Sequence, residues 1–175
     1  MDAKRPYLLY AYGNPGRLDD GLGPACARAF EVLALPQLSV ESDYQLTVED
    51  AWIVARHETV IFVDASMDAP APFTVEVVEA KARPQFTSHM CDAATVLATA
   101  REALGVTPRA FLLGIRGYEF HSYGEWLSPG ARTNLAKAIE FLKEVFEGGG
   151  VEKLLLAASL NRASRGSERG GEVKP

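Results

Sequence analysis

Residues 12–23 read Tyr12-Gly13-Asn14-Pro15-Gly16-Arg17-Leu18-Asp19-Asp20-Gly21-Leu22-Gly23. The stretch follows a short apolar run, residues 7–11, and precedes a helical pattern over residues 24–35. This order predicts a strand, a glycine-rich turn and a helix, and an α/β sheet binds ligands at the carboxyl ends of its strands. Glycines in such a turn usually bring backbone N–H groups close to an anion. Because Asp19 and Asp20 would repel an anion, we expect the turn to face a cation.

The rest of the chain continues the alternation of apolar, β-branched runs with helical patterns. The predicted strands are residues 7–12, 38–44, 59–64, 73–80 and 110–115. The predicted helices are residues 21–35, 48–56, 92–104, 129–146 and 151–160. Strands that alternate with helices favour a three-layer α/β/α sandwich around a mostly parallel, twisted, five-stranded sheet. We expect the run at residues 73–80, which follows a proline-rich loop, to form a peripheral antiparallel strand.

Length and composition limit the class of protein. A chain of 175 residues, 47% of them hydrophobic, predicts one globular domain, which we place at residues 1–160. Residues 161–175 are rich in Arg, Gly, Ser and Glu and predict a disordered tail. The net charge of -5 argues against a nucleic-acid partner and against an anionic membrane surface. No apolar run approaches the roughly 20 residues of a membrane span.

Cysteine usage suggests the compartment. Cys26 and Cys91 form no CxxC pair, so we expect reduced thiols in a cytoplasmic protein. The N-terminal residues lead into the first strand without a signal-type apolar region. Since no feature demands a dimer, we expect a monomer.

Three polar features fall at or near one edge of the predicted sheet. They are the Asp19-Asp20 pair after the first strand, Asp64 at the end of the buried third strand, and His89 just before a helix. Right-handed crossovers place the loops after parallel strands on a common edge. Two carboxylates and an imidazole form a plausible ligand set for a divalent transition ion. The three features together therefore predict a metal-contacting edge.

Each acid or histidine also has a purely structural interpretation. Asp19 or Asp20 could cap the first helix, because aspartate is a preferred N-cap residue. Asp64 could bond loop N–H groups, and His89 could be a helix-start residue with a satisfied ring. The combination, rather than any single residue, favours a metal.

Other functional classes have weaker support. Residues 21–26 read GxGxxC, but the third small position and the two preceding acids are wrong for a dinucleotide pyrophosphate. The sequence contains no G-x-S-x-G elbow, and Cys91 is better interpreted as a small buried residue than as a nucleophile. The loop at residues 117–126 carries aromatic side chains that would suit a protein partner or would pack over the end of the sheet.

The chain resembles the hydrogenase maturation proteases, endopeptidases that process the large subunit of nickel–iron hydrogenases. The resemblance spans roughly residues 7–146, and four elements carry it in the family's order. They are Gly13-Asn14-Pro15 with Asp19-Asp20-Gly21-Leu22-Gly23, then Phe62-Val63-Asp64-Ala65, then Thr87-Ser88-His89, and last Leu127-Ser128-Pro129. The resemblance implies that Asp20, Asp64 and His89 contact metal and carry out catalysis.

The resemblance also implies a substrate. The expected partner is the precursor of a nickel–iron hydrogenase large subunit, from which the enzyme removes a C-terminal extension. The nickel would be carried by that precursor, and no organic cofactor is expected. The cation would polarise the scissile carbonyl or activate a water, or Asp64 would act as general base while nickel positions the peptide. Two alternatives stay open: a metal-dependent binding protein or chaperone without peptidase activity, and an autonomous zinc hydrolase.

Overall fold

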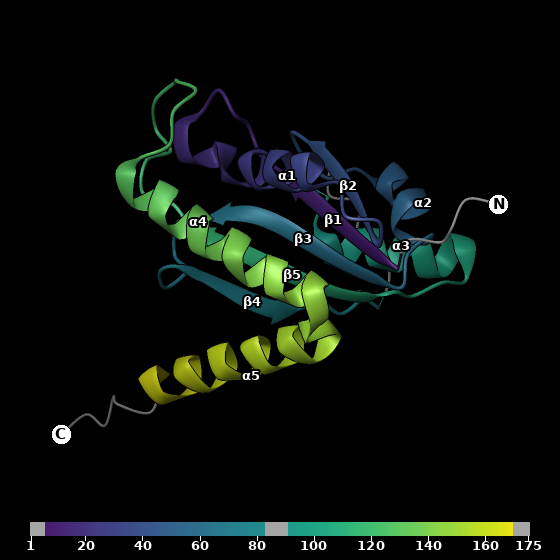
Figure 1. Cartoon of the computed structure of the whole chain (residues 1–175). Coiled ribbons are helices and arrows are strands. Elements are labelled where there is room, and N and C mark those ends of the chain that lie inside the picture. Colours follow the sequence, from purple (N-terminus) through teal and green to yellow (C-terminus); the bar gives the residue numbers. More distant parts are fainter. Residues whose placement is uncertain (1–5, 83–90, 170–175) are drawn as a thin grey trace.

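The fold was analysed in a computed structural model, which describes residues 6–82 and 91–169 (Figure 1). Within these residues five strands form one sheet, in the order β2-β1-β3-β5-β4. The strands are β1 (Tyr7–Tyr12), β2 (Leu38–Asp43), β3 (Thr59–Ser66), β4 (Phe73–Val77) and β5 (Arg109–Arg116). β1 runs parallel to β2 and β3, β3 runs parallel to β5, and β4 is antiparallel to β5. The predicted sheet, with its antiparallel peripheral strand, is confirmed.

Helices cover both faces of this sheet. They are α1 (Leu22–Leu33), α2 (Ala51–Val54), α3 (Ala93–Leu104), α4 (Pro129–Glu144) and α5 (Gly150–Arg169). Side chains of α1 and α4 pack with Leu9 and Ile61 on one face, whereas α2 and α3 pack with Leu8 and Phe62 on the other. Successive strand residues point to opposite faces, so this alternation also assigns a face to every later residue of β1 and β3.

Local signals explain where several helices begin. Thr47 and Asp50 form a capping box at the short 3-10 turn η2 (Val48–Asp50), which leads into α2. Ser128 caps α4 by accepting the backbone N–H of Ala131, and Pro129 takes the first helical position. α1 begins at Leu22, one residue after the predicted start, and a 3-10 turn, η1 (Leu18–Gly21), runs directly into it.

The C-terminal region differs from the prediction. α4 ends at Glu144, and a π-helical turn, η3 (Val145–Gly149), with Gly148 at φ 158°, separates it from α5. α5 then continues to Arg169, so the prediction of disorder from residue 161 is wrong for residues 161–169. The reason is tertiary: the Asn161 side chain donates a hydrogen bond of 3.0 Å to the carbonyl of Val75, which anchors α5 on β4. Residues 170–175 lie outside the described residues.

The packing of α5 leads to a prediction about the free energy of unfolding. Leu154 is fully buried in the same core as α1 and α4, whereas Leu160 on the same helix is 61% exposed. Leu154→Ala is expected to lower the free energy of unfolding by about 2–5 kcal/mol, because it removes core contacts and leaves a cavity. Leu160→Ala, the matched control, should change it by less than about 0.5 kcal/mol. Urea denaturation of both variants is the measurement, and equal, small effects would contradict the packing of α5.

None of the helices in the described residues is long and apolar enough to cross a membrane.

Candidate functional site

The turn after β1 is shaped by glycines around Asp20. Gly13 has φ 138°, and a Cβ there would lie 2.1 Å from the carbonyl oxygen of Asp20, so the position requires glycine. A Cβ on Gly23 would lie 2.3 Å from the carbonyl oxygen of Tyr12, so glycine there lets α1 pack against the end of β1. The backbone N–H of Asn14 donates to Oδ2 of Asp20 at 3.0 Å. This N–H therefore binds the chain's own carboxylate, which fits the expected departure from a phosphate-binding loop.

Asp19 has a different role from its neighbour. Its side chain is fully buried and accepts four hydrogen bonds. The donors are the backbone N–H groups of Tyr118 (2.8 Å), Glu119 (3.0 Å) and Ser128 (2.7 Å) and the Ser128 hydroxyl (2.7 Å). The first-helix capping interpretation is wrong, because neither η1 nor α1 has a side-chain cap. Asp19 instead ties the turn to the loop that joins β5 to α4.

These hydrogen bonds control the charge of Asp19. Burial by itself would raise the pKa of the carboxyl, but hydrogen bonds from Tyr118, Ser128 and Glu119 outweigh it and hold the pKa below its ordinary value. Just before it, Leu18 has φ 52°, a left-handed conformation that costs a non-glycine residue about 1–2 kcal/mol. The contacts of Asp19 thus offset backbone strain at the residue that precedes it.

Asp64 lies in β3, two residues before the strand ends rather than at its last position. Its Oδ1 accepts the backbone N–H of Ala65 at 2.7 Å. Burial, together with the smaller effect of the nearby charge of Asp20, raises the pKa of Asp64 to about 7, although hydrogen bonds from Ala65 and Tyr12 oppose the shift. A carboxyl with such a pKa can take up or release a proton near neutral pH.

The structure places Asp20 and Asp64 near enough for their charges to interact, at the carboxyl edge of the sheet. Each carboxyl is held by a backbone N–H group, from Asn14 and Ala65 respectively. Two neighbouring carboxylates repel one another, and a bound cation would relieve that repulsion. Carboxylate oxygens on a fixed scaffold suit the positioning of such a cation.

His89, the third predicted residue, lies within residues 83–90, outside the described residues, so its place in the site stays a prediction. Within the described ranges, no group of three or more His, Cys, Asp or Glu side chains is arranged to hold a metal ion. Asp92, three residues after His89, caps α3 by accepting the backbone N–H of Thr95 at 2.8 Å. Its side chain also forms a 2.6 Å ion pair with Lys81, so the described residues on both sides of this segment contact each other.

Tyr12 is a site residue that sequence reasoning missed. Its phenol forms a side-chain hydrogen bond with Asp64, and its pKa is raised by burial and by the charges of Asp64 and Asp92. The register of the parallel strands β1 and β3 explains this contact. Ala11 pairs with Val63, so Tyr12, the next residue of β1, lies beside Asp64. The sequence pattern predicts Tyr12 only as the last residue of a strand.

The nucleophile interpretation of Cys91, which the sequence already disfavours, also has little support in the structure. The thiol is half-buried and donates a weak hydrogen bond to the carbonyl of Asp92, with a sulfur–oxygen distance of 3.8 Å. Burial first, and nearby acids second, raise its pKa above the ordinary value. A thiol held in its protonated form is a poor nucleophile.

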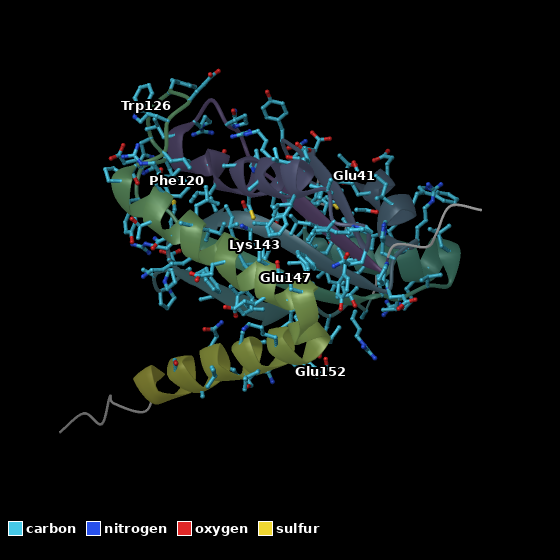
Figure 2. All side chains as sticks on the ribbon, viewed as in Figure 1. Glu41, Phe120, Trp126, Lys143, Glu147 and Glu152 are labelled. Carbon is cyan, nitrogen blue, oxygen red and sulfur yellow. The ribbon has the colours of Figure 1, made fainter. Side chains whose placement is uncertain are left out.

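The aromatic loop between β5 and α4 packs partly over the sheet end and is partly exposed. Tyr118 packs on Gly130, and its hydroxyl accepts a 3.1 Å hydrogen bond from Asn134, so part of the loop covers the sheet end. Trp126 folds over Gly124 yet stays 61% exposed, and Tyr123 is 83% exposed. Figure 2 shows Trp126 at the tip of this loop, projecting from the body of the molecule.

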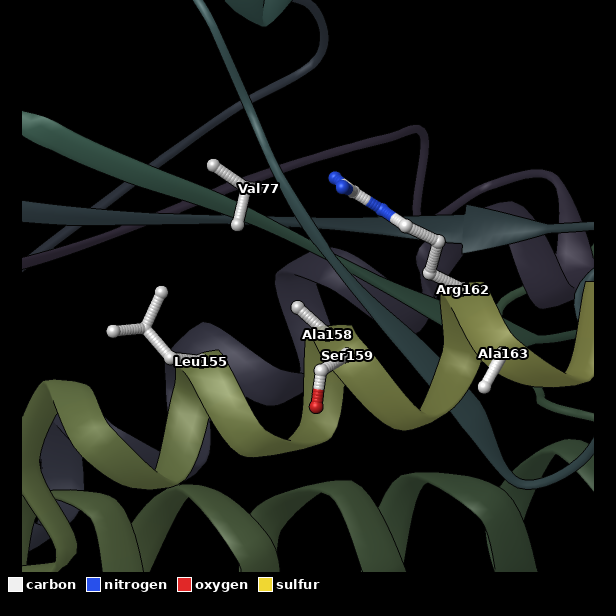
Figure 3. Close-up of a pocket in the computed structure, with 6 residues that line it drawn as sticks. All are labelled: Val77, Leu155, Ala158, Ser159, Arg162 and Ala163. Carbon is white, nitrogen blue, oxygen red and sulfur yellow. The ribbon is translucent and has the colours of Figure 1, made fainter.

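Two hollows lie at different distances from the acids. One, of about 330 Å³, adjoins the turn and is lined by Pro15, Leu18, Gly21, Arg28, Glu125 and Leu127. The other, of about 440 Å³, is a mostly apolar groove between β4 and α5 that is lined by Val77, Leu155, Ala158, Ser159, Arg162 and Ala163 (Figure 3). Because Val77 pairs with Phe111, near the start of β5, this groove lies toward the edge of the sheet opposite the acids. The first hollow therefore adjoins the turn that carries Asp20, although neither Asp20 nor Asp64 lines either hollow.

Comparison with known proteins identifies the fold. No protein-family model and no curated protein sequence matches the chain. Among solved structures, it is similar to the [NiFe] hydrogenase maturation protease HycI from Thermococcus kodakarensis, with a TM-score of 0.64 and 18% identity over 83% of this chain and 95% of that one. It is also similar to the hydrogenase maturating endopeptidase HybD from E. coli, with a TM-score of 0.66 and 19% identity over 82% and 93% of the two chains.

A third similar structure is a hydrogenase 2 maturation peptidase from a Thaumarchaeota archaeon, with a TM-score of 0.59 and 20% identity over 79% of this chain and 96% of that one. At such identities the likeness shows the fold alone. The chain thus has the fold of the hydrogenase maturation proteases, which confirms the fold that the sequence resemblance implied.

Proposed function

We propose that this protein is an endopeptidase that removes the C-terminal extension of a nickel–iron hydrogenase large-subunit precursor. The observation that carries the proposal is the approach of Asp20 and Asp64 at the carboxyl edge of this fold. The three solved structures reported above are described as hydrogenase maturation proteases, endopeptidases or peptidases, which supports the same activity here. A cytoplasmic monomer remains our expectation, and the free thiols of Cys26 and Cys91 support a reducing compartment.

Nickel enters this proposal as part of the substrate. Asp20, Asp64 and His89 would complete the coordination of a nickel ion that the precursor already carries. Two carboxylates and an imidazole suit such an ion, and the repulsion between the carboxylates would favour its arrival. Cleavage would then follow only when the precursor has been loaded with its metal.

Asp64 is central to either chemical route. As a ligand it would help the nickel ion polarise the scissile carbonyl. As a general base it would take a proton from the attacking water, and a pKa of about 7 suits that role near neutral pH. In both routes Asp20 holds the cation beside Asp64, and Asp19 holds the turn that carries Asp20.

The nickel requirement is tested with two forms of the same precursor. Nickel-loaded precursor is expected to lose its C-terminal extension, whereas nickel-free precursor should be cleaved at least about 100-fold more slowly, because the carboxylates have no cation to bind. The readout is the mass of the precursor over time, with the Asp20→Ala variant as control. Equal cleavage of both forms would contradict metal recognition, while leaving peptidase activity itself established.

A further inference from the structure

Tyr12 and Asp64 share one face of the sheet. Tyr12 has the same strand parity as Tyr10, and Asp64 has that of Phe62, so all four side chains point toward α2 and α3. Tyr10 and Phe62 already pack there, with ring centroids 6.2 Å apart. At the next position of this face, the phenol of Tyr12 lies beside the carboxyl of Asp64, where another apolar side chain would continue the pattern.

Contacts hold the Asp64 carboxyl at two points. The backbone N–H of Ala65 donates to Oδ1 at 2.7 Å, and the Tyr12 hydroxyl forms the side-chain hydrogen bond described above. A tyrosine hydroxyl is protonated at neutral pH, because its ordinary pKa is about 10, so it acts as the donor. A carboxyl fixed at two points has few rotamers left and presents its remaining lone pairs in one direction.

We propose that Tyr12 is a positioning residue that orients the Asp64 carboxyl for the reaction. This inference rests on the proposed peptidase function and concerns a residue that acts through Asp64 rather than on the substrate. Losing such a partner of a reacting or metal-contacting group typically costs about 10- to 100-fold in activity. The rival interpretation is that the Tyr12 ring merely fills space beside α3.

The chain offers a matched control. Tyr10 lies two residues earlier in β1, points to the same face, and its hydroxyl is hydrogen-bonded to Asp50 in the capping box rather than to a residue of the site. Tyr12→Phe and Tyr10→Phe therefore each remove one hydroxyl and keep the ring. Only the first variant removes a contact to Asp64.

The experiment measures kcat and KM for cleavage of nickel-loaded precursor by the full chain and both variants, together with their urea denaturation curves. Tyr12→Phe is expected to lower kcat by about 10- to 100-fold with KM changed less than about twofold. Tyr10→Phe should keep the wild-type kcat. In an Asp64→Asn background, Tyr12→Phe should cause no further loss, because the two residues act as one unit.

The outcomes separate the two claims. A wild-type protein that cleaves the precursor and a Tyr12→Phe variant with unchanged kcat would overturn the positioning role and leave the peptidase function intact. Equal losses of kcat in both variants, in step with lost stability, would also overturn it in favour of packing. A wild-type protein that leaves the precursor uncut overturns the peptidase function, and the positioning role with it.

Discussion

Asp19→Asn is expected to lower the free energy of unfolding by about 3–5 kcal/mol at neutral pH. The amide keeps the shape of the carboxyl but replaces one of its two acceptor oxygens with a donor. Both oxygens are engaged in the native protein, Oδ1 by the Ser128 N–H and Oδ2 by three further donors. At least one buried N–H group must then face another donor. Urea denaturation at pH 7 measures the loss.

The pH dependence of this effect has a definite sign. The folded-state pKa of Asp19 lies below its unfolded value of about 3.9. Its contribution to stability is therefore fully present above pH 4 and is lost as the pH falls through the folded pKa. The difference in the free energy of unfolding between wild type and Asp19→Asn should therefore become smaller at acidic pH. Asp68→Ala, at an exposed aspartate, is the control and should change stability by less than about 0.5 kcal/mol. A similar effect of both variants would contradict the anchoring role of Asp19.

Asp64→Asn is expected to produce the opposite combination, with activity lost and stability kept. Cleavage of the precursor should fall by about 100- to 10,000-fold. The neutral amide cannot serve as a base, and it lacks the negative charge that would attract a cation. The variant should be at least as stable as wild type at pH 8, since it removes a buried charge close to Asp20. The measurements are kcat on nickel-loaded precursor and urea denaturation at pH 5 and pH 8.

The sign of the stability change follows from the raised pKa. A group whose folded pKa is about 7, against about 3.9 unfolded, contributes stability that is complete below pH 4 and lost as the pH rises through 7. Wild type should therefore lose this contribution between pH 5 and pH 8, and Asp64→Asn should not. Asp43→Asn changes an exposed acid at the end of β2 and serves as control, with unchanged kcat. An active Asp64→Asn variant would remove Asp64 from the mechanism.

Features that depend on local pattern were predictable from the sequence. The apolar run of β3 predicted a buried central strand, and the glycines with two acids predicted the tight turn after β1. The different roles of Asp19 and Asp20 are harder to read, because they depend on donors in a loop about 100 residues away. The resemblance assigns the metal contact to Asp20, and the structure gives Asp19 an anchoring role in place of the capping role considered for it.

Two features that the sequence did not predict arise from tertiary contacts. Residues 161–169 have a polar composition that favours disorder, yet α5 is held on β4 through Leu154, Ala158 and Asn161. Tyr12 fits a strand pattern as well as any aromatic residue, and only its pairing beside β3 reveals the contact with Asp64. Composition and periodicity carry no record of such long-range contacts.

The central claim is that Asp20 and Asp64 belong to a peptidase that matures a hydrogenase large subunit. The most direct test is the mass of nickel-loaded precursor after incubation with wild type and with the Asp20→Ala, Asp64→Ala and His89→Ala variants. The account predicts that wild type shortens the precursor by its C-terminal extension, and that the three variants leave its mass unchanged over the same time. A precursor that binds the wild-type protein but keeps its full mass would contradict the account and would indicate a binding protein or chaperone instead.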